Sequence, residues 1–175
     1  MSRISVVFCV VIFLLSSIIC FSAELPVTPP PYWSVPKISE SPKIDGHIDE
    51  SEWKNASCIT GYQNFPDYGR GFSSLQTLAY TAWDDQYIYM AFRSPHTYRD
   101  PVLINVRGRD AAAYTDEAYE VIIWPPQKNE TYAFIVGLAS LYDAKYGNLS
   151  WNSPGIKYEI SQHNGYFDAE MAIPW

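Results

Sequence analysis

The chain has 175 residues, a net charge of −7 and 18% charged side chains. This length fits one domain of ordinary size behind a leader segment. The acidic balance argues against nucleic acid as a partner, because phosphates are neutralised by Lys and Arg. Two of the three cysteines, Cys9 and Cys20, lie in the apolar N-terminal stretch. Cys58 then has no internal disulfide partner, so the fold must depend on its core, and we expect a buried, inert thiol.

Residues 1–22 are predicted to be a secretory signal peptide. Arg3 supplies the positive start, residues 6–19 the apolar stretch and residues 20–22 the cleavage site. We therefore expect a secreted, extracellular protein. An uncleaved anchor is the alternative, because residues 4–21 nearly have the length that spans a bilayer. A membrane is a partner only in that case.

Residues 23–36 are predicted to be a Pro-rich linker, in which Pro29–Pro31 favours an extended polyproline II conformation. The predicted domain covers residues 37–175. Asp45-Gly46 is a tight-turn signal, and residues 49–52 could open a short helical turn, because acids are favoured at a helix N-terminus. The apolar side chains around this turn are spaced to pack together: Ile44, Ile48 and Trp53.

Short segments of alternating apolar and polar residues, bounded by turn residues, predict strands along the domain. A hairpin is expected from Leu75–Trp83, a turn at Asp84–Gln86, and Tyr87–Phe92. No segment of ten or more residues has the period of a helix. Together these patterns predict an all-β fold, an antiparallel, jelly-roll-like β-sandwich. The other predicted strands are 102–106, 118–124, 131–136, 157–161 and 166–173.

The last predicted strand ends at Ile173-Pro174-Trp175 with no following segment to cover it. An uncovered apolar edge favours aggregation. Either Pro174 protects this edge, or the sequence is incomplete at its C-terminus.

The strand at residues 118–124 carries one carboxylate, that of Glu120. A carboxylate set among apolar neighbours needs a partner or a ligand. Tyr114, in the Ala-rich stretch just before, could present its ring beside it. A ring for stacking and an acceptor for hydroxyls suit a sugar; the alternative is a strand with one charge at its solvent edge. Period-two alternation places Glu120 with Ala118, Ile122 and Trp124, opposite Tyr119, Val121 and Ile123.

Trp151 and Asn152 form a second candidate group in the loop before residue 157. With Tyr146 and Asn148 nearby, they could form part of a sugar platform. They could equally fasten a long loop to the sheet. Two further tryptophans, Trp83 and Trp124, are expected to pack in the core or at its rim.

Four blocks of the sequence, in order, resemble the successive blocks of family 9 carbohydrate-binding modules. The resemblance implies a β-sandwich that binds sugars, often at chain ends. Such modules are commonly attached to xylanases and other glycoside hydrolases, which implies a role in carbohydrate catabolism. The resemblance also implies a stacking aromatic at Tyr114 and a hydroxyl-accepting glutamate at Glu120. The blocks are IDGHIDESEW (44–53), AWDDQYIYMAF (82–92), YTDEAYEVII (114–123) and GYFDAEMAIPW (165–175).

The sequence departs from the family pattern at two positions. Tyr114 stands where the best-known members place Trp, and Ile135 stands where they carry an arginine on the next strand. The family continues beyond its last block, through further strands and a loop with a second stacking aromatic, which implies a domain incomplete at its C-terminus.

Some family members hold structural calcium, so calcium is a candidate cofactor. Turn carboxylates could supply hard oxygen ligands, although no spacing specifies a site, and solvated turn acids are the alternative. The candidates are Asp84, Asp85, Asp110 and Asp116.

Two other functions stay open. A pair of carboxylates facing a cleft could hydrolyse a glycosidic bond, but the spacing of the available acids identifies no catalytic residue. A related sandwich could instead hold haem, with Met90 and His96 or His163 as axial ligands. We therefore predict non-catalytic binding of mono- or polysaccharides by a secreted module. The acids considered for hydrolysis are Glu117, Glu120, Asp168 and Glu170.

Overall fold

The computed structural model describes residues 32–63, 71–97 and 101–175. The chain divides into two units, Met1–Trp33 and Ser34–Trp175, and every helix and strand of the described residues belongs to the second. The predicted signal peptide, residues 1–22, lies outside the described residues, as do residues 23–31 of the predicted linker. In the described ranges, no helix has the length and apolar character needed to cross a membrane.

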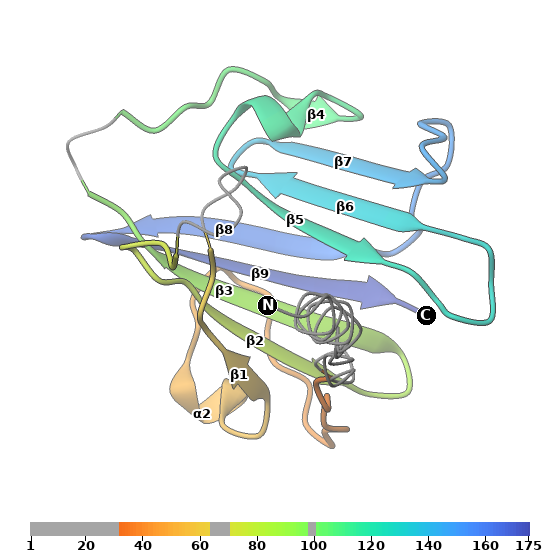
Figure 1. Ribbon diagram of the computed structural model, residues 1–175, viewed down its shortest axis with the longest axis horizontal. Coiled ribbons are helices and arrows are strands. Elements are labelled where there is room, and N and C mark those ends of the chain that lie inside the picture. Colours follow the sequence, from red (N-terminus) through yellow and green to blue (C-terminus); the bar gives the residue numbers. More distant parts are fainter. Residues whose placement is uncertain (1–31, 64–70, 98–100) are drawn as a thin grey trace, which may run out of the picture. The chain divides into compact units, whose positions relative to one another are not determined.

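Two β-sheets make up the second unit (Figure 1). Neighbouring strands are antiparallel except for one short parallel pair, β4 with β7, so the predicted all-β antiparallel sandwich is confirmed. The five-stranded sheet has the order β1 (Ser57–Ile59), β2 (Leu78–Trp83), β3 (Tyr87–Pro95), β9 (Tyr166–Pro174), β8 (Lys157–His163). The four-stranded sheet has the order β4 (Gly108–Arg109), β7 (Ser140–Lys145), β6 (Tyr132–Gly137), β5 (Ala118–Ile123). The described residues also form a helix, α2 (Glu50–Trp53), and a 3₁₀ helix, η1 (Ala113–Thr115).

The inward faces of the two sheets share one apolar core. Val121 and Phe134 from the four-stranded sheet pack in it with Met171 from β9. Phe92 and Tyr119 stack across the two sheets, with ring centroids 5.1 Å apart. The alternation predicted for β5 is therefore confirmed: its odd-numbered side chains face the core.

The outer face of the five-stranded sheet is covered by the segment around α2. Ile48 and Trp53 are buried there against Ala82, Ala91 and other residues of the sheet, with Ile44 packed beside them, as the sequence predicted. The helix begins after Asp49, whose carboxylate accepts a hydrogen bond from the Ser51 backbone N–H at 2.7 Å. This cap satisfies a donor that a helix start leaves open.

Glu170 anchors the turn before α2 to strand β9. Its carboxylate accepts hydrogen bonds from Trp53 Nε1 at 2.8 Å and from the backbone N–H groups of Asp45 and Gly46 at 3.0 and 2.9 Å. Burial raises the pKa of Glu170, while these three donors act against the rise. Gly46 has φ +80°, and a Cβ there would lie 2.5 Å from Ser161 Oγ, so the turn requires glycine.

Asp168, two residues before Glu170 on β9, anchors the same segment. Both of its oxygens accept hydrogen bonds from Arg93, at 2.7 Å each, and one also accepts from the Ile48 backbone N–H at 3.0 Å. Asp168 is fully buried, and such a carboxylate requires this pairing. Two of the blocks that carry the family resemblance, 44–53 and 165–175, are therefore bound to each other.

Residues 34–36, at the end of the predicted linker, run along β2. Trp83 donates its backbone N–H to Pro36 O at 3.1 Å and its Nε1–H to Val35 O at 3.0 Å. Ser57 Oγ donates to Ser34 O at 2.7 Å. The folded unit accordingly begins near Ser34.

Three expectations about strands and burial are wrong. Residues 102–106 form no strand, because the side chains of Asp116 and Glu117 bond their backbone N–H groups. Strand β9 is not an edge, since β3 and β8 flank it. Cys58 is exposed on the short strand β1 rather than buried.

Candidate functional site

The outer face of the four-stranded sheet presents Glu120. On β5, Glu120 pairs with Ile135 of β6, which pairs in turn with Tyr142 of β7. Cross-strand partners point to the same side of a sheet, and adjacent strands are about 4.8 Å apart. Glu120 and Tyr142 thus lie roughly 10 Å apart on one face, with Ile135 between them.

Tyr114 lies over this same face. It belongs to η1, which contacts β5, β6 and β7. Its ring packs against that of Tyr142, with centroids 6.3 Å apart and planes at 83°, and the side chain is 65% exposed. The structure therefore brings Tyr114 and Glu120 to one side of one sheet, each accessible to solvent.

Glu120 is exposed, so the expectation that apolar neighbours would enclose it is wrong. Its environment is that of the alternative, a strand with one charge at its solvent edge, because β5 is the edge of the four-stranded sheet in the described part of the chain. Among those residues, Glu120 forms no ion pair or hydrogen bond through its side chain. Its carboxylate is available to accept hydrogen bonds from a ligand.

The two acids just before β5 are occupied. Asp116 accepts hydrogen bonds from the backbone N–H groups of Asn105 and Val106 at 2.6 and 2.9 Å. Glu117 accepts one from the Leu103 backbone N–H at 2.5 Å. These bonds fix the approach to η1, and they leave Glu120 as the open carboxylate of the segment.

Trp151 and Asn152 fasten their loop to the sandwich. The Trp151 ring packs edge-on against Tyr132 and Phe134, with centroids 5.4 and 6.2 Å apart. Asn152 Oδ1 accepts a hydrogen bond from Arg109 Nε at 2.5 Å. Tyr132 and Phe134 face the core, so Trp151 lies on the inward side of the sheet whose outward side presents Glu120. The structure does not bring the two candidate groups together.

Arg109 also holds the same loop through a buried carboxylate. Its Nη2 donates to Asp143 Oδ2 at 2.5 Å, and the Ser153 backbone N–H donates to the same oxygen. Asp143 is fully buried, and its other oxygen has no hydrogen-bond partner among the described residues.

A hollow of about 450 Å³ lies between the sheets near this loop. Its walls are mostly apolar and come from both sheets, from the loop and from the end of β9. The lining residues are Ile88, Ile123, Pro125, Lys128, Tyr132, Phe134, Trp151, Ser153, Pro154, Ile173, Pro174 and Trp175.

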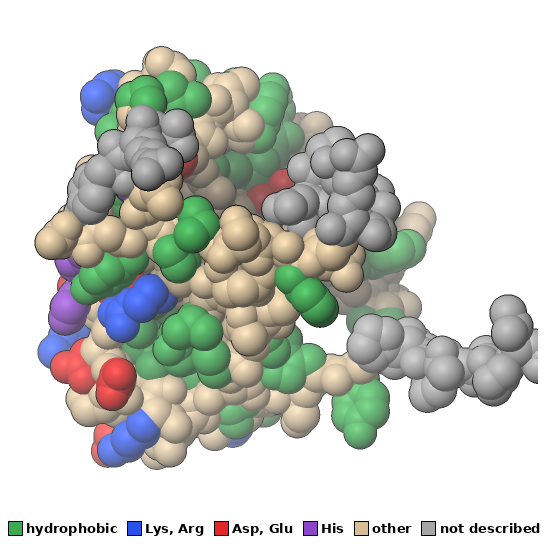
Figure 2. Space-filling view, turned by 60° about the vertical axis from the view of Figure 1, so that its left-hand side comes forward, with side chains coloured by type: hydrophobic (Ala, Val, Ile, Leu, Met, Phe, Trp, Pro, Cys, Tyr) green, Lys and Arg blue, Asp and Glu red, His purple; other side chains and the backbone are tan. Residues whose placement is uncertain are grey.

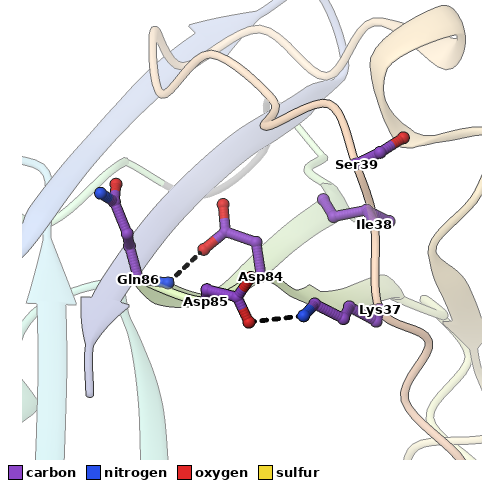
Figure 3. A pocket seen from close by; sticks show the side chains of 6 residues that line it. All are labelled: Lys37, Ile38, Ser39, Asp84, Asp85 and Gln86. Carbon is purple, nitrogen blue, oxygen red and sulfur yellow. Dashed lines mark hydrogen bonds and ion pairs between the residues drawn. The ribbon is translucent and has the colours of Figure 1, made fainter.

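An open depression of about 600 Å³ lies beside the β2–β3 turn (Figure 3). Lys37 and Asp85 form an ion pair across it, and Asp84 accepts from the Gln86 backbone N–H at 2.7 Å. Asp84 also accepts from Tyr89 Oη at 2.6 Å and from Ser41 Oγ at 2.8 Å. Burial would raise the pKa of Asp84, but these hydrogen bonds outweigh it and lower the pKa to about 2. Both carboxylate oxygens of Asp84 already accept hydrogen bonds within the protein, which indicates that this side chain stabilises the turn.

Calcium does not fit the four acids considered for it. Asp84 and Asp116 are saturated by hydrogen bonds, and Asp85 is paired with Lys37. In the part of the chain that the structure describes, the acidic, histidine and cysteine side chains that gather in a group of three or more around a possible ion are His47, His163 and Asp168, a group that does not include Asp110. Nitrogen ligands do not suit calcium.

The histidine group is also a poor site for other cations. The ligand atoms of His47, His163 and Asp168 lie within 4.8 Å of one another, but both oxygens of Asp168 are bound by Arg93, whose charge opposes a second cation. Histidine side chains lie at the surface beside acidic and basic ones in the face drawn in Figure 2.

The described side chains considered for glycoside hydrolysis and for haem binding do not lie in an arrangement that suits either function. Glu120 lies on the outer face of one sheet, whereas Asp168 and Glu170 are buried on the outer face of the other, so neither of them pairs with Glu120. The carboxylates of Asp168, Glu170 and Glu117 are all engaged in structural hydrogen bonds. Met90 packs in the core between the sheets, while His163 lies near His47 on the opposite face of the five-stranded sheet.

Two features of the site were missed in the sequence. Strand β7, which supplies Tyr142, follows β6 after only two residues, and it has no apolar–polar alternation that could have identified it, because Leu141 and Asp143 share one face. Trp124 was expected to pack in the core or at its rim, but it is 71% exposed.

Known structures with the same fold were found, although no protein-family model and no curated protein sequence matches the chain. A family 9 carbohydrate-binding module from Caldicellulosiruptor kristjanssonii in complex with cellotriose aligns with a TM-score of 0.53 at 15% identity, over 80% of this chain and 65% of that one. A family 9 module from the same organism in complex with glucose gives 0.50 and 16%, over 81% and 68%. A Bacteroides uniformis protein described as a candidate carbohydrate-binding protein gives 0.52 and 14%, over 69% and 61%.

The chain spans 61% to 68% of the length of these structures. At such identities the likeness shows a common fold, which agrees with the family resemblance of the four sequence blocks. The chain has the β-sandwich fold of family 9 carbohydrate-binding modules.

Proposed function

We propose that this protein binds saccharides, without catalysis, on the outer face of the four-stranded sheet. Tyr114 supplies the ring on which a sugar stacks, and Glu120 accepts hydrogen bonds from its hydroxyl groups. The observation that carries the proposal is the presence, on one face, of an exposed ring and a carboxylate that no described side chain engages. The shared fold supports it.

The proposed contacts imply weak binding. Stacking on one aromatic ring contributes about 1 kcal/mol beyond area burial, and hydrogen bonds to a charged acceptor contribute about 1.5–3 kcal/mol. Together they amount to about 2.5–4 kcal/mol, which corresponds to affinity in the millimolar range before the apolar area buried under the sugar ring is counted. Ile135, which pairs with Glu120, offers no donor to a sugar, which keeps the affinity in this range.

Glucose and its β-linked oligomers are the first ligands to test, because two of the structural neighbours, both family 9 modules, were solved in complex with glucose and cellotriose. We further propose that residues 1–22 direct secretion and that the domain attaches a glycoside hydrolase to polysaccharide in carbohydrate breakdown. The leader composition and the family resemblance support these two proposals.

The test is isothermal calorimetry with glucose, cellobiose and cellotriose. We expect Tyr114→Ala to lower affinity about fivefold or more, since it removes the stacking surface, while Tyr114→Phe keeps most of it. Glu120→Gln should lower affinity about tenfold, because it replaces a charged acceptor with a neutral amide.

Glu40→Gln is the matched control, since Glu40 is also an exposed glutamate but lies in the N-terminal segment. If both Tyr114→Ala and Glu120→Gln bind every sugar as the parent does, the site assignment is wrong.

A further inference from the structure

Trp124 is held as an exposed aromatic plate at the end of β5. It follows Ile123 directly and is 71% exposed. Pro125 comes next, and a proline restricts the preceding residue to an extended backbone. The Lys128 backbone N–H donates to Pro125 O at 3.1 Å, which closes the turn that follows. The indole is therefore presented by a restricted backbone, which lowers the entropy cost of binding.

Trp124 points to the outer side of the sheet. Its two neighbours, Ile123 and Pro125, line the hollow between the sheets, whereas Trp124 does not. The alternation of inward and outward side chains in β5 thus continues through Trp124 and Pro125, the two residues after the strand ends at Ile123. On this basis Trp124 shares a face with Glu120 and with Ile122, which is 61% exposed.

The outer face then holds two aromatic plates on different sides of Glu120. Trp124 lies four positions after Glu120 in the direction of the strand, a distance of roughly 13 Å. Tyr114 lies across the sheet, roughly perpendicular to the strand, against Tyr142 of β7, which is in register with Glu120 through Ile135. One sugar ring cannot cover both plates, but a chain of rings that passes Glu120 can.

Building on the proposed function, we infer that Trp124 is a second stacking residue and that the site takes a linear oligosaccharide of three or more pyranose rings. One ring stacks on Tyr114, the hydroxyls of the chain reach Glu120, and a distal ring stacks on Trp124. Ile122 provides apolar surface between Glu120 and Trp124 on the same face. Trp124 therefore sets the preference for chain length.

The experiment measures affinity by calorimetry for glucose, cellobiose, cellotriose and cellotetraose. For the parent, affinity should rise with chain length until the chain spans both plates. Trp124→Ala should bind glucose as the parent does but lose about fivefold for the longest sugar, as expected for one stacking contact. Trp124→Phe should recover most of that loss. Trp175→Ala, an equally exposed tryptophan that lines the inter-sheet hollow, should follow the parent throughout.

Two results would overturn the inference. One is a Trp124→Ala variant that follows the parent at every chain length while Tyr114→Ala is impaired, which leaves the proposed function intact. The other is a change from dimer to monomer in Trp124→Ala, measured by analytical ultracentrifugation, with unchanged sugar affinities; this would assign the surface to a second copy of the chain. If the parent binds none of the sugars, the proposed function itself fails.

Discussion

Asp84, Asp116 and Glu120 are all carboxylates at or near strands, yet the donors around each give it a different role. Asp84 accepts four hydrogen bonds in a turn, and Asp116 holds the backbone of residues 105 and 106. Glu120 has no such donors among the described residues. An acceptor that the fold already satisfies has little to offer a ligand, so the open one marks the candidate site.

Asp84 should contribute a pH dependence to stability. Its pKa in the folded protein, about 2, is below the usual value of about 3.9 in unfolded chains. A lowered pKa stabilises the fold above the unfolded value, and this contribution is lost as the pH falls from about 4 through about 2.

We therefore expect Asp84→Asn to be less stable than the parent at pH 7 and to lose less stability between pH 4 and pH 2. Urea midpoints at pH 7, 4 and 2.5 measure this difference. Asp85→Asn, in the same turn, is the control, and equal acid slopes for the parent and Asp84→Asn would contradict the assignment.

At the scale of elements, the segment 44–53 depends on strand β9 for its position. Glu170 bonds two backbone N–H groups of the turn and the indole of Trp53, while Asp168 bonds Ile48. A helix of four residues is too short to be stable alone. Tertiary bonds, together with the apolar contacts of Ile48 and Trp53, must hold it.

Glu170→Gln should loosen this segment. A glutamine has one acceptor oxygen and adds an N–H₂ donor, so at least one donor now bonded to Glu170 loses its acceptor. We expect a loss of about 1–3 kcal/mol in the free energy of unfolding and faster amide hydrogen exchange at Asp45 and Gly46.

Glu159→Gln is the matched control for this substitution. Glu159 is the cross-strand partner of Glu170 on β8, but it is exposed. Equal exchange rates in the parent and Glu170→Gln would show that apolar packing alone positions the segment.

At the scale of the molecule, the two sheets depend on one shared core. Met171 is fully buried at its centre, in contact with a cluster that includes Val121 and Phe134 of the other sheet. Because the sheets bury their apolar faces against each other, we expect them to unfold together.

Met171→Ala should lower the free energy of unfolding by about 2–5 kcal/mol, through lost burial and the cavity left behind. Ile122→Ala, on the exposed outer face, should change it by less than about 0.5 kcal/mol. Urea unfolding followed by near-UV and far-UV circular dichroism measures both. Separate transitions in the two signals would contradict a common core.

Several parts of this fold could be predicted from local sequence. The β2–β3 hairpin, the short helix after Asp49 and the two faces of β5 follow from residue periodicity, turn residues and capping. These features depend on neighbours a few positions apart. The antiparallel sandwich followed from the same patterns.

The candidate site could be predicted only in part. Tyr114 and Glu120 were selected from the sequence, and the structure places them on one face, although it leaves Glu120 exposed rather than enclosed. Trp151 was selected with them, but it packs on the inward side of the same sheet. Periodicity says which residues share a face of one strand; it does not say which face a distant loop will cover.

The sequence by itself determined most of the strands, the inward and outward residues of β5, and the short segment that carries a ring and an acid. The tertiary structure alone decided that β9 lies between β3 and β8, that β5 is an edge, and that Tyr142 supports Tyr114 from β7. Strand order and sheet packing depend on contacts between residues far apart in the chain. The alternation of apolar and polar residues within one strand does not specify which strands it will contact.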